Sequence, residues 1–415
     1  MQRKGSNSVH VRNYNERVVL ETLRRYGEGS KAELARSANL TPQAVAGIVD
    51  ALVDAGLVEP KGKRFGQVGQ PSIIYGPVLD GAFSIGLHIG RRSLDAVLVD
   101  FAGQIRASET HEYEFPEPDS VLSLAISCIR RFMDALPETT KDRVIGVGLA
   151  MPYFLGGWKS EQNVSEAVAG AWQAFDLKAK LAAASGLSIH LENDASAAAV
   201  AELVHGAGRN YKNFIYFFMN TFIGGGLVLD GSLSTGAHGN SGAFGPYPVT
   251  PSRLSTVPPP AGPFEILLRR ASVAVLIRHL RACGVEIGKL KDLEFLPESA
   301  QPFVDEWQED CADALAQAIV GSIAVIDVDA VIIDSILPAA LLNSTVASVV
   351  RRFNEIVPDG LIRPAIVVGS IGAKAVAIGG AILPVYDMFA PDSSVLLKKT
   401  RSNKRPLLVG SGGQR

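Results

Sequence analysis

Small and polar side chains gather at the start of one predicted helix near the N-terminus. Thr41 is followed by Gln43, Ala44 and Gly47, and the helical period places these side chains away from the apolar stripe of the same helix. A glutamine amide can make a bidentate contact with adenine in the major groove, while small neighbours let the helix backbone approach the base edges. This face therefore has the chemistry of a DNA-reading helix.

A basic segment follows this helix. Lys61, Lys63 and Arg64 lie in a glycine-containing turn between two short strand-like runs. Cationic side chains on such a hairpin, or wing, would contact phosphates beside the adjacent groove, and Lys31 and Thr41 are further candidates for phosphate contact. The full set of residues expected to bind DNA is Lys31, Thr41, Pro42, Gln43, Ala44, Gly47, Lys61, Lys63, Arg64, Gln67 and Gln70.

Local signals predict the helices that would position these residues. An apolar face over residues 15–26 indicates a first helix, and Ser30 with Glu33 forms a capping box that starts a second. Thr41 is the expected N-cap of a third helix, with Pro42 at its first position. The apolar residues of that helix follow the i, i+3, i+4, i+7, i+8 pattern and are Val45, Ile48, Val49, Leu52 and Val53.

Two strands, expected near Val58 and over residues 73–75, complete a winged helix-turn-helix within residues 1–80. These residues contain eleven Lys and Arg against eight Asp and Glu, whereas the whole chain has a net charge of −2, so positive charge is concentrated here. Asp50 and Asp54 lie further along the exposed face of the third helix, where they would repel phosphates unless that end leaves the groove. A protein-interaction module with a solvated basic loop is the alternative interpretation.

Beyond residue 82 strand and helix patterns alternate, which is typical of a mixed α/β body. Strands are expected over 83–89, 94–99, 144–149, 213–219, 226–229, 330–333 and 365–368, and helices over 120–136, 175–185, 195–204, 303–323 and 373–386. No repeat of fixed short period is present in the sequence. Residues 396–415, basic and then glycine-rich, are predicted to form a flexible tail.

The cysteines and the apolar segments give no sign of a metal site or a membrane span. Cys128, Cys283 and Cys311 are far apart, with no Cys-x-x-Cys pair and no His at ligand spacing, so the sequence predicts core thiols. The longest apolar stretch, near residues 320–336, is interrupted by three Asp residues. The first residues are polar and show no secretory signal. We therefore expect a cytoplasmic protein without a metal, a cofactor or a membrane partner.

Four segments of the body, residues 85–93, 191–198, 224–245 and 377–381, carry a family resemblance. The first stands where sugar kinases of the ROK family have an Asp-Ile-Gly-Gly-Thr turn, the second resembles their Glu-Asn-Asp-Ala-Asn-Ala-Ala segment, and the third has the spaced glycines of the family signature. The chain is similar to this family, which also contains repressors, over nearly its whole length, wing included. The resemblance implies an actin-like, two-lobed kinase fold with a sugar site between the lobes.

The resemblance also implies an effector site. Asp194 aligns with the catalytic base of the kinases, Asn193 with a neighbouring sugar contact and Glu265 with a Glu that follows the zinc loop of the family. We expect these three residues to bind the effector. The residues alone also fit a helix N-cap at Asn193 and Asp194, because both residue types cap helices well, although a cap needs only one of them.

Several positions depart from the kinases. His88 replaces an Asp that supports magnesium-bound phosphate, although magnesium prefers oxygen ligands, and Arg91 and Arg92 replace a Gly-Gly that lets phosphate approach the backbone. We expect His88 to be a core or cleft histidine, and Arg91 and Arg92 to form a degenerate phosphate loop or a solvated turn. Asp334 and Ser335 replace a second Gly-Gly, at the adenosine contact.

The family's zinc-binding motif is also altered. Residues 246–263 contain no Cys, and Ala243 and Pro246 replace a sugar-contacting Glu and the His that follows it. We expect neither zinc binding nor phosphoryl transfer, with Asp194 as a vestigial base.

The sequence therefore predicts a DNA-binding transcriptional regulator, and more narrowly a repressor of carbohydrate genes. A sugar or sugar phosphate would bind in the body, residues 81–395, without being phosphorylated, and a homodimer or homotetramer would place two heads on a palindromic operator. One alternative is an ATP-dependent sugar kinase with an accessory head, which Asp194 and the glycines at 224–226 favour. The other is a regulator whose body serves only oligomerisation.

Overall fold

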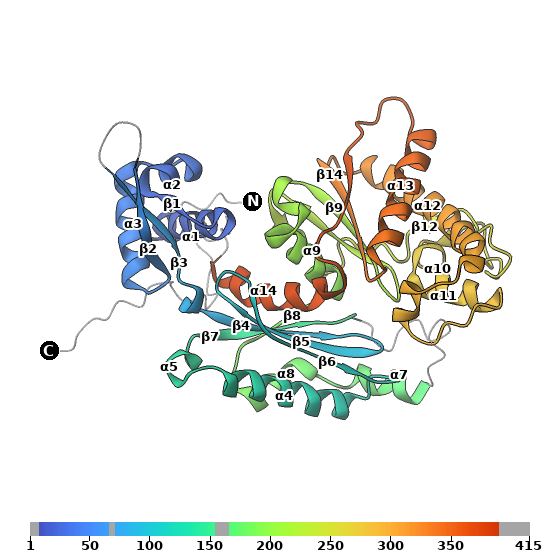
Figure 1. Cartoon of the computed structure of the whole chain (residues 1–415), viewed down its shortest axis with the longest axis horizontal. Helices are drawn as coiled ribbons and strands as arrows, with labels where there is room; N and C mark the ends of the chain where they lie inside the picture. Colours follow the sequence, from blue (N-terminus) through green and yellow to red (C-terminus); the bar gives the residue numbers. More distant parts are fainter. Residues whose placement is uncertain (1–7, 66–70, 154–165, 390–415) are drawn as a thin grey trace.

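A computed structural model describes residues 8–65, 71–153 and 166–389 of the chain. Figure 1 shows a small N-terminal head beside two larger lobes, each built on its own sheet. The predicted fold class is confirmed: a winged helix-turn-helix head is joined to a two-lobed α/β body. Gln67 and Gln70 lie outside the described residues.

The head packs three helices against a three-stranded antiparallel sheet of order β1-β3-β2. Val19 and Leu23 of the first helix, Leu34 of the second, and Val49 and Leu52 of the third are buried together. The first helix starts ahead of its predicted position. The elements are α1 (Ser8–Tyr26), β1 (Gly29–Ser30), α2 (Lys31–Ala38), α3 (Pro42–Asp54), β2 (Val58–Arg64) and β3 (Ser72–Pro77).

The predicted helix caps are confirmed. The Ser30 hydroxyl accepts a hydrogen bond from the Glu33 amide at 3.2 Å, and the Glu33 carboxylate accepts one from the Ser30 amide at 2.8 Å. Thr41 caps α3 by accepting from the Ala44 amide at 3.3 Å. Between these helices Asn39 adopts a left-handed conformation with φ 53°, which ends α2 and turns the chain toward α3. Local hydrogen bonds and the turn at Asn39 therefore set where α2 ends and where α3 begins.

The first lobe contains a five-stranded sheet of order β6-β5-β4-β7-β8. The first three strands pair antiparallel, and β4, β7 and β8 run parallel. Helices α4 and α8 cover the outer face of the sheet (Figure 1). The elements are β4 (Phe83–Ile89), β5 (Ser93–Asp100), β6 (Ile105–Glu112), α4 (Pro118–Ala135), α5 (Glu138–Lys141), β7 (Val144–Ala150), α7 (Glu166–Gln173), α8 (Leu177–Ser185) and β8 (Ile189–Glu192).

The second lobe repeats this strand arrangement in the order β11-β10-β9-β14-β15. Its first three strands are again antiparallel, and its last three again parallel. The repeat is therefore one of fold, which a search for short sequence periods does not detect. The strands are β9 (Phe214–Met219), β10 (Gly224–Leu229), β11 (Ser232–Leu233), β14 (Ala330–Ser335) and β15 (Ala365–Val368).

Helices on the outer side of the second sheet enclose the larger hydrophobic core. They are α10 (Leu268–Ala271), α11 (Val273–Ala282), α12 (Gln301–Ile323) and α13 (Ala339–Ile356), with a small sheet of β12 (Pro248–Val249) and β13 (Glu265–Ile266) nearby. Short 3₁₀ turns span Leu79–Gly81, Ala207–Asn210, Leu290–Glu294, Glu298–Ala300 and Gly372–Lys374.

Two central helices, α9 (Asp194–His205) and α14 (Ala375–Phe389), join the lobes. Each follows the last strand of one lobe and packs on the sheet of the other: α9 contacts β9 and β10, whereas α14 contacts β4 and β7. The two helices also pack on each other. The body is therefore a five-layer arrangement in which this helix pair lies between the two sheets (Figure 1).

Glycines allow this close approach of helix and sheet. A Cβ atom on Gly148 of β7 would lie 1.7 Å from the carbonyl oxygen of Gly380 in α14. A Cβ atom on Gly379 would lie 1.8 Å from the carbonyl oxygen of Ala197 in α9. The obstacles are backbone atoms, which cannot rotate away as a side chain can.

The C-terminal part of α14 connects the body to the head. Val385 and Phe389 are buried in the same core as Val19 of α1, and Phe389 packs edge-to-face on Phe101 with ring centroids 5.2 Å apart. Arg24 of α1 donates a hydrogen bond to the Phe101 carbonyl oxygen at 3.2 Å. Residues 372–389 have the length and composition of a membrane span, but more than half of this segment is buried inside the protein. The helix therefore has the burial of a core helix.

Candidate DNA-binding face and ligand site

The N-terminal half of α3 presents an open face. Thr41, Gln43, Ala44 and Gly47 are exposed, while Val45 on the opposite side is fully buried. Apart from the neighbouring backbone of α3 itself, no atom in the described part of the chain lies within 4 Å of the place where a Cβ on Gly47 would stand. The positive end of the helix dipole and the exposed side chain of Gln43 are thus accessible to a partner.

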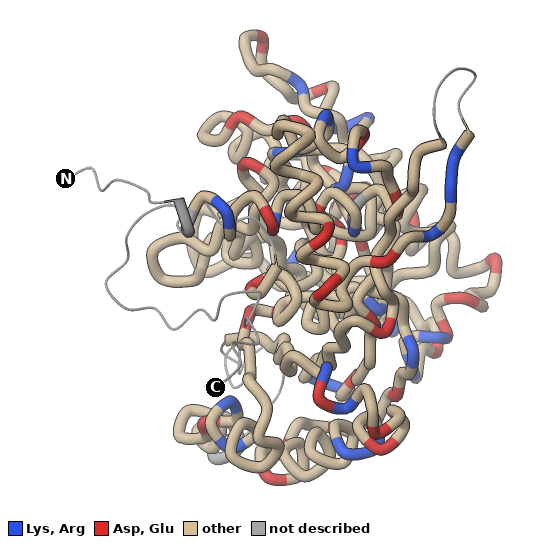
Figure 2. Tube along the Cα trace, turned by 90° about the vertical axis from the view of Figure 1, so that its left-hand side faces the viewer, with Lys and Arg blue, Asp and Glu red and all other residues tan. Residues whose placement is uncertain are grey.

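The basic side chains around this face have acidic partners. Lys31 Nζ lies 2.6 Å from Asp50 Oδ1, and Lys61 Nζ lies 2.5 Å from Glu59 Oε1. Figure 2 shows Lys and Arg along the hairpin next to the grey trace. These ion pairs are partly exposed, so each contributes little to stability and can be exchanged for contacts with phosphate.

Arg64 has two such partners. Its guanidinium lies 2.8 Å from Glu33 Oε1 and 3.4 Å from Glu28 Oε1. Lys63 is exposed on the same strand. The acidic partners were not predicted, because Glu28 and Glu33 are far from Arg64 in the sequence.

His88 lies near the end of strand β4, just before the first turn of the body, and its side chain is buried. Its Nδ1 lies 3.2 Å from Asp95 Oδ2, and its Nε2 is buried without a hydrogen-bond partner among the described residues. Burial alone would raise the pKa of Asp95, but hydrogen bonds from His88, Thr110 and Ser93 together lower it. His88 is therefore a buried histidine whose ring is held by a hydrogen bond to the ionised carboxylate of Asp95.

The two arginines of this turn differ. Arg92 is exposed and donates to the carbonyl oxygen of Glu114, as a solvated turn residue would. Arg91 instead lies over the ring of Phe222, 4.8 Å from its centroid, and thus crosses to the second lobe. Burial lowers the pKa of Arg91, whereas the nearby Asp194 carboxylate raises it. Within the described part of the chain, its buried Nη1 has no hydrogen-bond partner.

Asn193 and Asp194 begin α9. Asn193 is the N-cap, since its Oδ1 accepts from the amides of Ala195 at 3.1 Å and Ser196 at 3.4 Å. The cap interpretation therefore holds for Asn193. The Asp194 carboxylate accepts a hydrogen bond from the Ala195 amide at 2.9 Å. Its negative charge also interacts with the guanidinium of Arg91.

Two further residues support this helix start and were not assigned a role from the sequence. Glu192 Oε1 accepts from the Asn193 amide at 2.8 Å and from the Tyr153 hydroxyl at 2.6 Å. Burial and the bond to Glu192 raise the pKa of Tyr153. Tyr153 also contributes to a cavity of about 160 Å³ beside β7 and β8. The signal for Glu192 was its place in the Glu-Asn-Asp segment, whereas Tyr153 had none.

The spaced glycines bring the second lobe close to α9. A Cβ on Gly224 would lie 2.8 Å from the Cβ of Ala195, and one on Gly226 would lie 2.6 Å from that of Ala199. Gly242, with φ 78°, packs in turn against the backbone of Gly226. The glycines thus place β10 directly on the first turns of α9.

Glu265 stands on a separate element, the short strand β13. Its side chain is buried, with Oε1 accepting from the Ile266 amide at 2.9 Å and lying 3.8 Å from Arg269. Its Oε2 is buried and, among described residues, lacks a hydrogen-bond partner. Arg91 and Asp194 are thus brought together, while Glu265 contacts its own neighbours.

Asp334 lies near the end of β14, and its carboxylate is buried. It accepts from the amides of Ser335 at 2.8 Å and Gly372 at 3.0 Å, and from the Tyr216 hydroxyl at 3.1 Å. Burial, reinforced by the charge of Glu202, raises the pKa of Asp334 to about 6. Its Cβ also occupies the space beside Gly369.

Glu202 of α9 completes this arrangement. Its Oε1 accepts from the amides of Ser370 at 2.6 Å and Ile371 at 2.9 Å. With Gly372 bound by Asp334, three successive backbone N–H groups of the turn before α14 are held by carboxylates of the chain itself. Successive N–H groups of this kind form an anion site when they are free.

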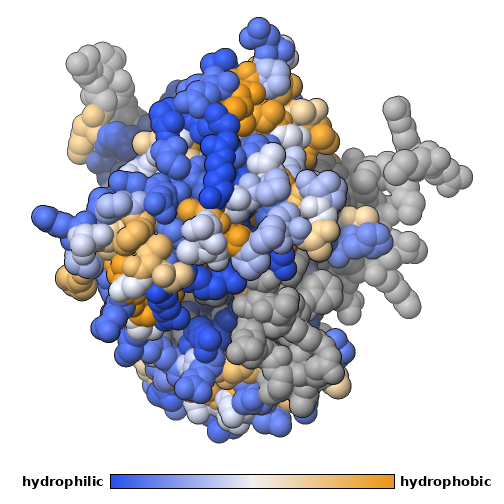
Figure 3. All heavy atoms as spheres, turned by 90° about the vertical axis from the view of Figure 1, so that its right-hand side faces the viewer, coloured by the Kyte–Doolittle hydropathy of each residue, from blue (hydrophilic) through white to orange (hydrophobic). Residues whose placement is uncertain are grey.

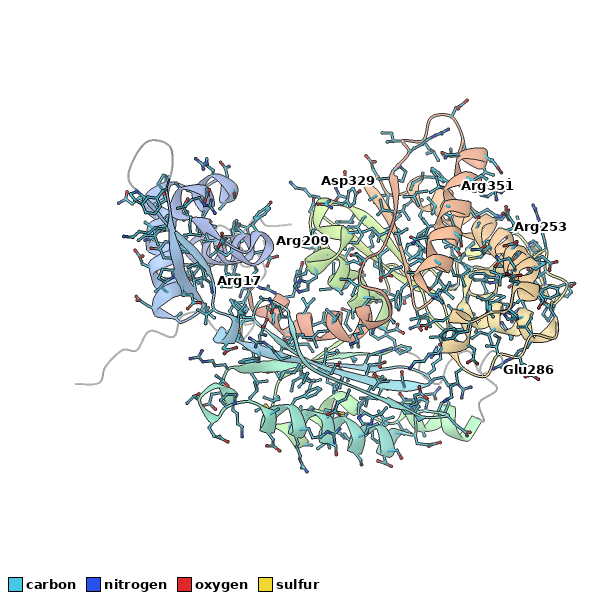
Figure 4. All side chains as sticks on the ribbon, viewed as in Figure 1. Arg17, Arg209, Arg253, Glu286, Asp329 and Arg351 are labelled. Atoms are coloured by element: carbon cyan, nitrogen blue, oxygen red, sulfur yellow. The ribbon has the colours of Figure 1, made fainter. Side chains whose placement is uncertain are left out.

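The loop that follows β12 is held by a buried ionic network. Arg270 makes a two-point contact with Asp310, at 2.8 and 3.1 Å, and reaches Asp313 at 3.1 Å. Asp310 accepts from the Arg253 amide at 2.8 Å and the Ser252 hydroxyl at 2.9 Å. The side of the molecule formed by the second lobe displays both hydrophilic and hydrophobic side chains (Figure 3), and Arg253 and Arg351 lie on this side (Figure 4). A cavity of about 480 Å³ beside the network contains none of the predicted site residues.

Comparisons with known proteins agree with this geometry. The ROK family matches residues 84–385. The uncharacterized protein y4fQ of Sinorhizobium fredii is 27% identical over 90% of this chain and 91% of its own length. The xylose repressor of Bacillus spizizenii is 25% identical over 58% of this chain, and the alignment spans 62% of that protein. A glucokinase of Halalkalibacterium halodurans is 29% identical over 40% of this chain and 50% of its own.

A solved structure of a ROK family transcriptional regulator, a homologue of the Mlc protein of E. coli, has the same fold. It superposes with a TM-score of 0.66 at 19% identity and covers 91% of this chain and 96% of its own. That span is too long to lie within the body alone, so it includes the head. The chain belongs to the ROK family and shares the head-and-body fold of the regulators in that family.

Proposed function

We propose that this protein is a sequence-specific DNA-binding repressor of carbohydrate uptake or metabolism genes, which responds to a sugar or sugar derivative without phosphorylating it. The observation that carries the proposal is the exposed N-terminal half of α3, with Gln43 and Gly47 free on a helix whose other side is core. Residues 1–80 would bind the operator, residues 81–395 the effector and a second copy of the chain, and residues 396–415 would be a basic tail.

Ion-pair exchange supports the DNA-binding assignment. Lys31 is paired with Asp50 of α3, and Lys61 and Arg64 lie on the wing strand β2. The partly exposed partners of all three are carboxylates that phosphates can replace. Lys63 adds a further cation on the wing. The xylose repressor relative supports the assignment to repressors of sugar genes.

Unpaired buried polar atoms support an effector site. Arg91 Nη1 is a donor and Glu265 Oε2 an acceptor, and neither has a hydrogen-bond partner within the described residues. Buried polar groups are costly when unpaired, and sugar hydroxyls both donate and accept. Asp194, which faces Arg91, would bind another hydroxyl. If the effector is a sugar phosphate, its phosphate would bind Arg91. Equal affinity of the protein for the sugar phosphate and for the free sugar would exclude this form of the proposal.

The nucleotide positions support binding without phosphoryl transfer. His88 offers an imidazole, already paired with Asp95, where a phosphate-bound magnesium ion would need an oxygen ligand. Asp334 and Glu202 occupy the N–H groups of the turn before α14. A magnesium nucleotide therefore does not fit these residues well.

The second candidate function is an ATP-dependent sugar kinase with an accessory head. Asp194, in the position of the kinase base, and the glucokinase relative favour it. A body that serves only oligomerisation is a third possibility, which the changes at Ala243 and Pro246 favour.

Selection of bound duplexes from a random DNA pool tests the proposed function directly. The expected result is a palindromic sequence whose affinity falls steeply with salt. A thermal-shift panel of sugars and sugar phosphates then identifies the effector class, and a coupled assay with ATP measures phosphorylation. No enrichment of a DNA sequence would refute the repressor assignment, and turnover of a sugar would favour the kinase.

A further inference from the structure

Three metal-binding side chains meet on the outer side of the first lobe. Glu109 and His111 alternate on strand β6 and point to the same side of it, where Cys128 of α4 faces them. Each offers one donor atom, namely a carboxylate oxygen, an imidazole nitrogen and a thiol sulfur, and these atoms all lie within 4.8 Å of one another. None of the residues of the proposed effector site belongs to this cluster.

The separations match those between ligands of one zinc ion. Glu109 Oε2 lies 3.0 Å from His111 Nε2 and 3.6 Å from Cys128 Sγ. Tetrahedral zinc, with bonds of about 2.0 Å to oxygen and nitrogen and about 2.3 Å to sulfur, places such ligand pairs about 3.3 and 3.5 Å apart. The atoms of these two pairs therefore need to move by only a few tenths of an ångström to share one ion. The third pair, His111 Nε2 and Cys128 Sγ, lies within 4.8 Å.

A cationic group already occupies the centre of the cluster. Nη2 of Arg131 contacts all three donors: it binds Glu109 Oε2 and lies 3.4 Å from both His111 Nε2 and Cys128 Sγ. About half of the Arg131 side chain is exposed, so it can leave into solvent without disturbing the core. The guanidinium thus marks the place that a metal cation would take.

We propose that Glu109, His111 and Cys128 form a zinc site in which Arg131 is the occupant when metal is absent. A thiolate, an imidazole and a carboxylate suit zinc, whereas magnesium and calcium prefer oxygen ligands alone. Three protein ligands leave the fourth position to water. A bound ion would fasten the edge strand β6 to α4.

Zinc binding at this site exchanges one cation for another and releases a proton. Zinc binds the thiolate form of a cysteine, so the Cys128 thiol loses its proton to solvent when its sulfur binds the ion. The positive charge of Arg131 repels a zinc ion bound nearby, so replacing Arg131 with a neutral residue should strengthen zinc binding.

Zinc titration of the full chain, after treatment with a chelator, tests the proposal. One zinc ion should bind with micromolar or tighter affinity. His111→Gln and Cys128→Ser should each weaken binding at least tenfold, whereas Arg131→Gln should strengthen it. Cys283→Ser and His238→Gln are matched controls, because they remove the same groups elsewhere, and they should leave the affinity unchanged.

Cobalt substitution gives a second measurement. A near-ultraviolet band from a thiolate bound to cobalt should appear in the parent protein and be lost in Cys128→Ser. Since His111 is partly exposed, His111→Gln keeps the test valid even if the buried cysteine variant fails to fold. Binding that is absent, or that persists in both ligand variants, would overturn the proposal and leave a hydrogen-bonded cluster.

Discussion

Lys31 Nζ lies 2.6 Å from Asp50 Oδ1, so a cation of α2 is held by an anion on the exposed face of α3. Asp50 would also stand near the phosphates when α3 enters a groove. Asp50→Asn should therefore increase DNA affinity several-fold, because it removes a repulsive charge and frees Lys31. Asp134→Asn, an equal change of charge on α4 of the body, should have no effect in the same titration.

Gln43 and Lys63 should differ in what they contribute to DNA binding. Gln43→Ala should relax the preference for one base pair, since the amide is expected to read a base edge. Lys63→Ala should weaken binding to all sequences alike and reduce the salt slope by about 1, as expected for a phosphate contact. Binding curves on the selected site and on single-base variants separate the two effects. Identical profiles for both variants would contradict the assignment.

Local chemistry made the head predictable from its sequence. The caps at Ser30 and Thr41 act over three residues, so the start of each helix could be predicted correctly. The strand at Ile105–Glu112 was missed because it is an edge strand with partly exposed, mainly polar side chains and no apolar run. Alternating hydrophobicity is weak in such a strand.

The ligand sites depend on contacts between distant segments, and there prediction from the sequence was incomplete. Arg91 and Arg92 are equivalent in sequence, yet only Arg91 reaches Phe222 of the other lobe. Cys128 appeared to have no His at ligand spacing, but the pairing of β6 beside α4 brings His111 to it. Residue type alone does not contain such information, because the packing of a helix on a strand and of one lobe on the other decides which side chains meet.

Gly148 is expected to tolerate no side chain. In Gly148→Ala the new Cβ would meet the carbonyl oxygen of Gly380, so α14 must move away from the sheet, at a cost of about 3 kcal/mol or more in the free energy of unfolding. Gly170→Ala is the control, since among the described residues no atom outside the glycine's own stretch of α7 lies within 4 Å of its Cβ position. That variant should be neutral or more stable by up to about 1 kcal/mol. Chemical denaturation measures both, and equal stabilities would contradict the close packing.

Arg270 should be essential for the stability of the second lobe. Arg270→Met would leave the buried carboxylates of Asp310 and Asp313 without their shared cation, at a cost of about 3–5 kcal/mol. Arg351→Ala, which breaks a mostly exposed pair with Glu309, should cost no more than about 1 kcal/mol. Denaturant titration of the two variants should therefore give clearly different midpoints. A small loss for Arg270→Met would mean that water replaces the guanidinium.

The raised pKa of Asp334 predicts a stability that depends on pH. In the folded protein this carboxyl takes up its proton at a pH of about 6, whereas an Asp in the unfolded chain does so near about 4. Between these values the folded state binds more protons, so the contribution of Asp334 to stability falls as pH rises from about 4 to about 6. The full difference corresponds to about 3 kcal/mol.

The variant Asp334→Asn tests this prediction, because its side chain takes up no proton in this pH range, and the other titrating groups are common to both proteins. The difference in unfolding free energy between wild type and variant should therefore grow as the pH is lowered through this window, and parallel curves would show that Asp334 titrates normally.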